Sequence, residues 1–356
     1  MQRKDRKMVT CEQKPAIGPS IWRGASLDED DSWIYRLSEA DIQEIDSALE
    51  TLPTALADLR HFDIKTFPLP NLSSRLYALQ HDIVEGRGFV LIKGMPIYRY
   101  TLFQAAAAYW LIGRHFGEPV SQNAEGHLLG HVRDQRAATG NPSRRAYQTS
   151  EALRFHTDSC DIVGLFCRHA AAKGGLSRIA SAGAVHNAIR DTRPDLLGAL
   201  YQPFAVSRIG EIPTGKLPWY MTPIFNDFGG CLTCIYPARD LRAAETLSKA
   251  PRLTKQQEEA LELLDKLAEE FCLKMDFEPG DMQFLHNHTI LHGRTAYDDE
   301  NTQGGHRHLL RLWLSAPNGR PLPPHFAERY GTVEQGAVRG GIICPETELS
   351  TPIDID

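Results

Sequence analysis

The sequence has no long run of basic residues and no apolar segment long enough to cross a membrane. Its formal net charge is −6 and its isoelectric point is about 6.2, so it offers no electrostatic footprint for nucleic acid. The longest apolar runs, such as residues 89–92, have the length of a strand, whereas a membrane-spanning helix needs about 20 apolar residues. We therefore expect neither nucleic acid nor a membrane among its partners.

Cysteines are few and scattered, and the first residues lack the apolar core of a secretory signal. The seven cysteines are odd in number and show no disulfide framework. Cys231 and Cys234 have the CxxC spacing of a zinc or redox pair, but no second CxxC accompanies them. The two glycines before Cys231 favour a strand with ordinary buried thiols. These features predict a cytoplasmic protein in a reducing compartment.

No internal repeat or low-complexity block is present. At 356 residues with 42% hydrophobic residues, the chain can bury the core of one large domain, which we expect over residues 19–330. Residues 1–18 are polar and charged without apolar periodicity, which predicts a disordered tail. Prolines and glycines after Pro317 predict an irregular C-terminal tail over residues 331–356. The sequence does not decide between a monomer and a homo-oligomer.

Several stretches show the periodicity of helices or strands. Ser38 and Thr254 begin capping patterns that are followed by apolar residues at helical spacing, and Thr101 caps a third such stretch. Short apolar runs next to glycines are typical of buried strands. The expected elements are helices that begin after Ser38 and Thr101, helices over 72–84, 182–201 (divided at Pro194) and 254–272, and strands over 88–94 and 162–167.

A His-x-Asp motif at residues 156–158 can hold a metal ion. Side chains at i and i+2 on a strand point to the same face, so His156 and Asp158 can reach one ion together. His292 would complete a set of two imidazoles and one carboxylate with open positions, which suits non-haem Fe(II). The motif alone carries little weight, because a chain of this composition should contain about one by chance, and residues 61–63 form a second.

Three features leave alternatives open. If residues 286–292 form one continuous strand, His288 shares a face with His292 and is a rival ligand. The polar loop over residues 134–150 is either a lid over the site or an ordinary surface loop. Ser177, which follows two glycines, either supplies a hydroxyl donor at the start of a strand or lies in a plain hairpin turn.

A set of motifs follows in a fixed order: 156–158 (HTD), 174–177 (GGLS), 279–282 (PGDM), Asn287, 292–294 (HGR) and 307–314 (RHLLRLWL). Over roughly residues 20–325 this order and spacing resembles the taurine dioxygenase-like (TauD/TfdA) family of Fe(II)/2-oxoglutarate-dependent oxygenases. The resemblance implies a mainly β fold with flanking α-helices, whose core is a double-stranded β-helix, also called a jelly roll or cupin-like fold. It also implies a lid or substrate insert over about residues 204–275.

The resemblance assigns the central site residues. His156, Asp158 and His292 would be the catalytic iron ligands. Arg307, fifteen residues after His292, would grip the distal carboxylate of the cosubstrate 2-oxoglutarate, and Ser177 would contact it where relatives most often have threonine. A planar, permanently charged guanidinium suits a carboxylate better than lysine does.

The remaining assignments concern the substrate. Arg311 lies four residues after Arg307 on the same strand face, so it would bind a substrate carboxylate, or 2-oxoglutarate if the register differs. Arg239 or Arg294 could also neutralise the substrate. On the resemblance alone, Gln122 and Asn123 would line the pocket. Specificity is expected to depend on residues 120–155 and 204–245.

We therefore expect an Fe(II)- and 2-oxoglutarate-dependent dioxygenase that uses O₂ and releases succinate and CO₂. Its substrate would be a small, carboxylate-bearing, amino-acid-like molecule whose unactivated C–H bond is oxidised by hydroxylation, desaturation or oxidative cyclisation. One alternative is a non-catalytic metal- or ligand-binding protein on the same barrel. Another is a zinc hydrolase, for which the sequence lacks a His-Glu-x-x-His helix.

Overall fold

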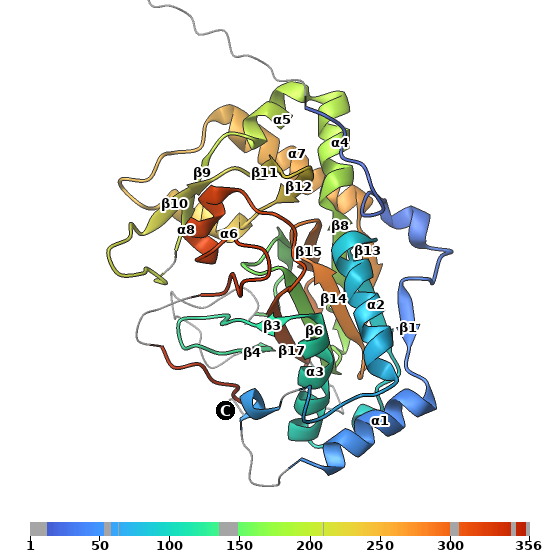
Figure 1. The fold of residues 1–356 in the computed structure, drawn as a ribbon. Helices are drawn as coiled ribbons and strands as arrows, with labels where there is room; N and C mark the ends of the chain where they lie inside the picture. Colours follow the sequence, from blue (N-terminus) through green and yellow to red (C-terminus); the bar gives the residue numbers. More distant parts are fainter. Residues whose placement is uncertain are drawn as a thin grey trace, which may run out of the picture.

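The computed structural model describes residues 13–52, 58–62, 64–134, 149–208, 210–299, 306–342 and 347–353. In this part of the chain two sheets stack face to face, and helices cover their outer faces (Figure 1). This arrangement confirms the jelly-roll core with flanking helices. None of the helices in the described ranges is both long and apolar enough to span a bilayer.

The larger sheet has seven strands, and apart from the parallel pair at one edge its neighbours run antiparallel. In spatial order the strands are β1 (Ile34–Arg36), β2 (Phe89–Lys93), β14 (Met282–His286), β6 (Ile162–His169), β17 (His308–Ser315) and β3 (Glu118–Pro119), and β4 (Leu129–Val132) also pairs with β17.

The smaller sheet has four antiparallel strands, and its register sets up the site. The strands are β13 (Leu273–Met275), β8 (Ser177–Ser181), β15 (Ile290–Arg294) and β5 (Leu153–His156). Three further strand pairs are β9 (Phe204–Ser207) with β10 (Trp219–Thr222), β11 (Phe225–Phe228) with β12 (Cys231–Cys234), and β7 (Lys173–Gly174) with β16 (Tyr297–Asp298). In the β5–β15 pair, His156 lies directly opposite His292.

Helices form the outer layers (Figure 1). The larger sheet is covered by α2 (Leu72–Glu85) and α3 (Leu102–Phe116), with α1 (Glu39–Glu50) beside them. The smaller sheet is covered by α4 (Ala182–Thr192), α5 (Pro194–Leu200) and α7 (Lys255–Phe271). The short elements are α6 (Ala238–Ala244), α8 (Ala327–Tyr330), η1 (Gly24–Leu27), η2 (Leu59–His61), η3 (Ile97–Arg99) and η6 (Pro324–Phe326).

Strand β17 shows how the alternation of side chains builds these layers. Leu310, Leu312 and Leu314 point outward and join the hydrophobic cluster with α3. Leu309 and Trp313 point inward and join the cluster between the two sheets. Because successive side chains on a strand face opposite sides, Arg311 shares the inward face with these two residues. Arg307, directly before β17, lines the same space between the sheets as Leu309 and Arg311.

The helix predictions are confirmed at their capping residues. Ser38, Thr101 and Thr254 each accept a hydrogen bond from the backbone N–H three residues later, and the side chain of that residue accepts one in return. Pro194 begins α5 after α4 has ended at Thr192, so the 182–201 stretch is divided as expected. The strands at 88–94 and 162–167 are β2 and β6.

The N-terminal boundary differs from the prediction. Residues 1–12 lie outside the described residues, but Ala16 is bonded to α4, where the amide of Asn187 accepts from the N–H of Ala16 at 2.7 Å and donates to its carbonyl at 2.8 Å. Residue 18 is therefore too late a boundary for a disordered tail, because this reciprocal pair fixes the chain before it. Most of the 134–150 loop, residues 135–148, lies outside the described residues, as do residues 343–346 and 354–356 of the C-terminal tail.

Candidate active site

Two imidazoles and one carboxylate converge where β5 and β15 pair. His156 ends β5, His292 lies in the middle of β15, and their ring centroids are 4.2 Å apart. His156 Nε2 lies 3.7 Å from Asp158 Oδ1, and His292 Nε2 lies 3.6 Å from Asp158 Oδ2. The ligand atoms of these residues all lie within 4.8 Å of one another, which is compatible with one shared metal ion.

The donor set and its protonation fit iron(II). His156 Nδ1 donates to the carbonyl of Arg154 at 2.9 Å, which leaves the lone pair on Nε2 directed toward Asp158. Burial and the neighbouring His292 lower the pKa of His156 to about 4, so the ring is neutral at neutral pH. Two imidazole nitrogens and one carboxylate oxygen on one face leave open coordination positions, as in non-haem Fe(II) oxygenases.

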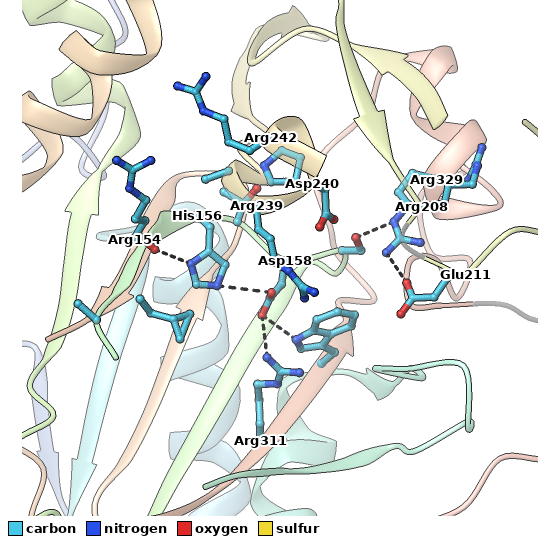
Figure 2. Close-up of a pocket in the computed structure, with 17 residues that line it drawn as sticks. Arg154, His156, Asp158, Arg208, Glu211, Arg239, Asp240, Arg242, Arg311 and Arg329 are labelled. Atoms are coloured by element: carbon cyan, nitrogen blue, oxygen red, sulfur yellow. Dashed lines mark hydrogen bonds and ion pairs between the residues drawn. The ribbon is translucent and has the colours of Figure 1, made fainter. Parts of the chain in front are cut away.

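One oxygen of Asp158 is held by neighbours from β17. The indole N–H of Trp313 donates to Oδ2 at 2.8 Å, and the Arg311 guanidinium lies 3.6 Å from the same oxygen (Figure 2). Burial alone would raise the pKa of Asp158, but Arg311 and His292 hold that pKa well below its usual range. The carboxylate is therefore ionised and fixed in rotation, with Oδ1 directed toward His156.

The backbone of Asp158 is fixed by Asn287. The Asn287 side chain accepts from the N–H of Asp158 at 2.8 Å and donates to the carbonyls of Asp158 at 2.7 Å and Cys160 at 2.8 Å. All of its hydrogen-bonding capacity except one lone pair is thus used on the turn that carries the ligand carboxylate.

Asn287 lies at the tip of a hairpin, which makes the continuous-strand expectation for residues 286–292 wrong. β14 ends at His286, β15 starts at Ile290, and the three residues between them form a turn. His288 Nε2 consequently bonds to the buried Asp161 at 2.8 Å instead of facing the triad. Arg339 binds the same carboxylate at 3.0 Å, so His288 belongs to a separate buried ionic network.

A small cavity of about 60 Å³ opens from the triad between the two sheets. Ser177, Arg294 and Arg307 line it together with the triad. Ser177 Oγ donates to Gln283 at 3.1 Å, and Arg307 Nη2 donates to the carbonyl of Gly175 at 3.3 Å. Within the described residues, Arg307 Nη1 is buried without a hydrogen-bond partner.

The small cavity holds two buried guanidinium groups against one aromatic ring. Arg294 and Arg307 lie 4.6 Å and 5.1 Å from the ring centroid of Tyr297. Burial, together with the charge of Arg307, lowers the pKa of Arg294 to about 10. In the described part of the chain, Nε and Nη1 of Arg294 also have no hydrogen-bond partner. Two neighbouring cations with unpaired N–H groups fit the distal carboxylate of an acid such as 2-oxoglutarate.

A larger cavity of about 360 Å³ is lined by His156 and Asp158 (Figure 2). It shares Leu153, His156, Asp158 and Arg311 with the small cavity, so both open onto the same ligand atoms. Its remaining walls come from the segments around 208–211 and 237–242 and from Arg329 of α8. Figure 2 shows Arg239 extending from α6 toward Asp158.

Thr157 connects the metal-binding motif to a wall of the larger cavity. Its N–H donates to the carbonyl of Tyr236 at 2.9 Å, and its hydroxyl oxygen accepts from the N–H of Tyr236 at 2.8 Å. α6 begins two residues later, and Arg239 is its second residue. This pairing fixes the position of Arg239 relative to His156 and Asp158.

Some of the residues predicted to bind the substrate line a cavity, whereas others are bonded within the protein and line neither cavity. Arg239 and Arg311 line the larger cavity, but Arg294 lines the small one. Gln122 is buried behind Arg311, where its carbonyl accepts from Nε at 2.7 Å and its amide donates to the backbone carbonyl of the same residue at 2.8 Å. Asn123 bonds to His127 within a local turn. Neither amide lines the two cavities, because both are occupied by these internal bonds.

Sequence reasoning missed several residues at the site. Trp313 could have been found from the alternation of β17, because it lies two residues after Arg311. Arg154 could have been found in the same way, two residues before His156 on β5. Arg208 and Arg329 carry no local signal, since only the fold brings β9 and α8 to the triad.

Comparison with known proteins agrees with this geometry. Residues 53–313 match the family described as taurine catabolism dioxygenase TauD, TfdA family. FR-33289 synthase of Streptomyces rubellomurinus is 31% identical over 330 residues, which cover 91% of this chain and 97% of the relative. The taurine hydroxylase-like protein SAT17 of Stachybotrys chartarum is 30% identical over 306 residues, which cover 82% and 77%. The chain belongs to the TauD/TfdA family.

Solved structures support the fold. An asparagine oxygenase in complex with Fe(II), 3-hydroxyasparagine and succinate superposes with a TM-score of 0.58 at 16% identity, over 80% of this chain and 93% of that one. The non-haem iron oxygenase OrfP with Fe and α-ketoglutaric acid gives 0.60 at 16% identity, over 79% and 94%. As the sequence predicted, the protein is an Fe(II)- and 2-oxoglutarate-dependent dioxygenase.

Proposed function

We propose that His156, Asp158 and His292 bind the iron, that Arg307 and Ser177 hold the distal carboxylate of 2-oxoglutarate in the small cavity, and that a small substrate occupies the larger cavity. The observation that supports this most directly is that two separate cavities meet at one metal-binding group. When bound, the iron, 2-oxoglutarate and O₂ supply the oxidation of a substrate C–H bond, with release of succinate and CO₂.

Arg307, directly before β17, and Arg311 within β17 have different positions, which supports different roles. Arg307 lines only the small cavity, whereas Arg311 lines both and lies beside Asp158. We therefore assign Arg307 to the cosubstrate and Arg311 to the substrate side. Gln122 holds Arg311 from behind and orients its guanidinium.

The substrate is proposed to be a carboxylate-bearing, amino-acid-like molecule. Arg311 and Arg239 supply guanidinium groups for such a carboxylate. Two solved structures with this fold carry hydroxylated amino acids, 3-hydroxyasparagine in the asparagine oxygenase and a hydroxy-arginine in OrfP. The hydroxylated amino acids in these two structures favour hydroxylation over desaturation or cyclisation as the reaction of this enzyme.

We also propose that the enzyme works in the cytoplasm. Five cysteines of the described residues are free, including Cys231 and Cys234 at the two ends of β12. Free thiols are typical of a reducing compartment.

Anaerobic titration of the metal-free protein with Fe(II) and then 2-oxoglutarate tests the assignment. The parent should develop the weak visible charge-transfer band of an iron–keto-acid complex. His156→Ala should abolish the band, and Arg307→Ala should shift its appearance to much higher 2-oxoglutarate concentration. His306→Ala is a matched control, because this neighbouring imidazole is 65% exposed and lies outside both cavities.

The same experiment separates the enzyme from a binding protein. Release of succinate in air, coupled to consumption of 2-oxoglutarate, is expected only of the oxygenase. A folded, iron-loaded protein that shows no band would overturn the site assignment, and a band without any succinate release would favour the non-catalytic alternative.

A further inference from the structure

The chain that follows β17 returns to the turn that carries Asp158. The N–H of Gly341 donates to the carbonyl of Ser159 at 2.7 Å, and the hydroxyl oxygen of Ser159 accepts from Arg329 Nε at 2.8 Å. Both contacts come from residues that lie beyond the part of the chain that matches the family. Residues 329–342 therefore hold the chain one residue after Asp158.

Arg339 brings a positive charge into the interior at this turn. Its Nε lies 3.1 Å and 3.0 Å from the two carboxylate oxygens of Asp161, and its Nη2 donates to Oδ1 at 3.0 Å. The same carboxylate accepts from the N–H of Ala316 at 3.1 Å and bonds to His288 Nε2 at 2.8 Å. The side chains of Arg339 and Asp161 are 1% and 0% exposed. Burial opposes ionisation, but His288 and Arg339 hold the pKa of Asp161 below its usual range, so Arg339 neutralises a buried anion.

Glycines make room for this ion pair. A Cβ at Gly319 would collide with Arg339 Nη2 and lie 3.0 Å from Asp161 Oδ2. Gly340 has a φ of +84°, and a Cβ there would lie 2.7 Å from the carbonyl oxygen of Ser159. Because only glycine accepts both the positive φ and the close approach, the backbone on both sides of the pair is fitted to it.

Asp161 is connected to the ligand carboxylate through the backbone. It lies three residues after Asp158, its N–H donates to the carbonyl of Leu314 at 3.1 Å, and its carbonyl accepts from the N–H of Asn287 at 2.9 Å. The side chain of Asn287 bonds to the N–H and the carbonyl of Asp158, and the next residue, His288, bonds to the Asp161 carboxylate. A displacement of Asp161 would therefore move the turn that carries Asp158 and the hairpin turn that holds it.

We propose that Arg339 is a positioning residue for the iron: its ion pair with Asp161 fixes the turn of residues 158–161 and thereby the direction of the Asp158 carboxylate. This inference rests on the proposed function, which makes Asp158 an iron ligand. Removal of one partner from a buried pair leaves the other charge uncompensated, whereas replacement of both by neutral amides does not. The loss of one partner should thus loosen the ligand turn, and the loss of both should loosen it less.

The test compares Arg339→Gln, Asp161→Asn and the variant with both substitutions. Fe(II) dissociation constants come from anaerobic titration of the metal-free proteins, and amide hydrogen exchange of residues 157–162 is followed without any metal. Each single variant should bind Fe(II) about tenfold more weakly or worse and exchange these amides faster. The double variant should recover most of both losses. Arg339→Lys, which keeps the charge but loses the planar fork, should fall between the parent and Arg339→Gln.

A control is needed for a general loss of stability. Leu76→Ala serves this purpose, because Leu76 is a fully buried residue of α2, which covers the outer face of the larger sheet. This substitution should lower the melting temperature by leaving a cavity in the core. The Fe(II) dissociation constant and the exchange of residues 157–162 should stay at the parent values. If Arg339→Gln does not fold, Arg339→Lys and the double variant provide the same comparison.

The outcomes separate this inference from the proposed function. Parent values of Fe(II) affinity and amide exchange in the Arg339 variants would overturn the positioning role, even with a lower melting temperature. Equal weakening of Fe(II) binding by Leu76→Ala, at an equal loss of melting temperature, would overturn it as well. Failure of the parent protein to bind Fe(II) would overturn the proposed function, whereas the exchange measurement would still test the link between Arg339 and the turn.

Discussion

At the scale of single residues, the carboxylate of Asp158, a proposed iron ligand, is held by two side chains outside the group of possible metal ligands. Asn287 fixes the backbone of Asp158, and Trp313 fixes one of its oxygens. Neighbours of this kind orient a ligand and commonly change metal affinity by 10- to 100-fold when they are removed. In the sequence Asn287 was noted only as part of a motif. Its role could not be predicted, because its hydrogen bond to the backbone of Asp158 joins residues 129 positions apart.

Trp313→Phe removes the indole N–H while keeping most of the aromatic volume. Asp158 Oδ2 then loses its shortest hydrogen bond, and we expect Fe(II) affinity to fall by about tenfold or more. Trp110→Phe is the matched control, since its buried indole N–H has no partner in the described part of the chain and it lies in α3, within the core. The measurement is the Fe(II) dissociation constant from anaerobic titration. Equal constants for the parent and Trp313→Phe would contradict a role of the Trp313 hydrogen bond in Fe(II) binding.

At the scale of elements, the sequence predicts what local chemistry determines. The capping pattern at Thr254 and the apolar stripe after it identify α7 to within one residue at each end. The strand at 162–167 is found for a similar reason, because an unbroken apolar run needs cover on both faces. The turn at residues 287–289 was missed because its stabilising bonds reach Asp158, Cys160 and Asp161, which local sequence cannot reveal.

Thr254→Ala tests the contribution of one cap. The Thr254 hydroxyl oxygen accepts from the N–H of Gln257 at 3.1 Å, and loss of such a cap costs about 1 kcal/mol of unfolding free energy. Because α7 packs on the outer face of the smaller sheet, the iron–keto-acid band should be unchanged. Thr192→Ala serves as control, since among the described residues this exposed hydroxyl bonds within α4, to the carbonyl of Ala188. Urea denaturation of the three proteins measures the difference.

The site shows the same division between local and long-range information. His156, Asp158 and His292 were predicted from spacing and resemblance, and the register of β5 against β15 brings them together. Arg239 and Arg311 were predicted as substrate residues and do line the larger cavity. The places of Arg208 and Arg329 in its wall could not be predicted, because they come from segments that meet only through the packing of β9 and α8. Gln122 was assigned to the pocket, yet its amide is occupied by Arg311.

At the scale of the whole molecule, several histidines are buried in the described residues with lowered pKa values, which makes the fold sensitive to acid. His308 is one of them and bonds to His131 at 2.8 Å. Burial, followed by the charges of His131, Arg168 and Arg133, lowers the pKa of His308 to about 3. Between about pH 3 and the unfolded value near 6.5, the unfolded chain binds a proton here that the folded chain does not.

The unfolding free energy should therefore rise with pH across this window and fall as the solution is acidified. One such histidine contributes a slope of about 1.4 kcal/mol per pH unit. His308→Gln should remove about one histidine's share of the slope, whereas His306→Gln, at an exposed neighbouring position, should not. Urea denaturation of the metal-free proteins at pH 5 and pH 7 provides the measurement. An unchanged slope in His308→Gln would show that this imidazole is already protonated in the fold.

Apart from four shared residues, the two cavities are lined by different parts of the chain, so the lining of one can be redesigned separately. Residues 208–242 contribute to the larger cavity and to none of the small one. A combinatorial library confined to that stretch should therefore change which acceptor molecule is oxidised while the proposed iron ligands and cosubstrate contacts stay as they are. Tyr236 should be kept in any such library, because its backbone pairing with Thr157 aligns the exchanged wall with the reacting centre.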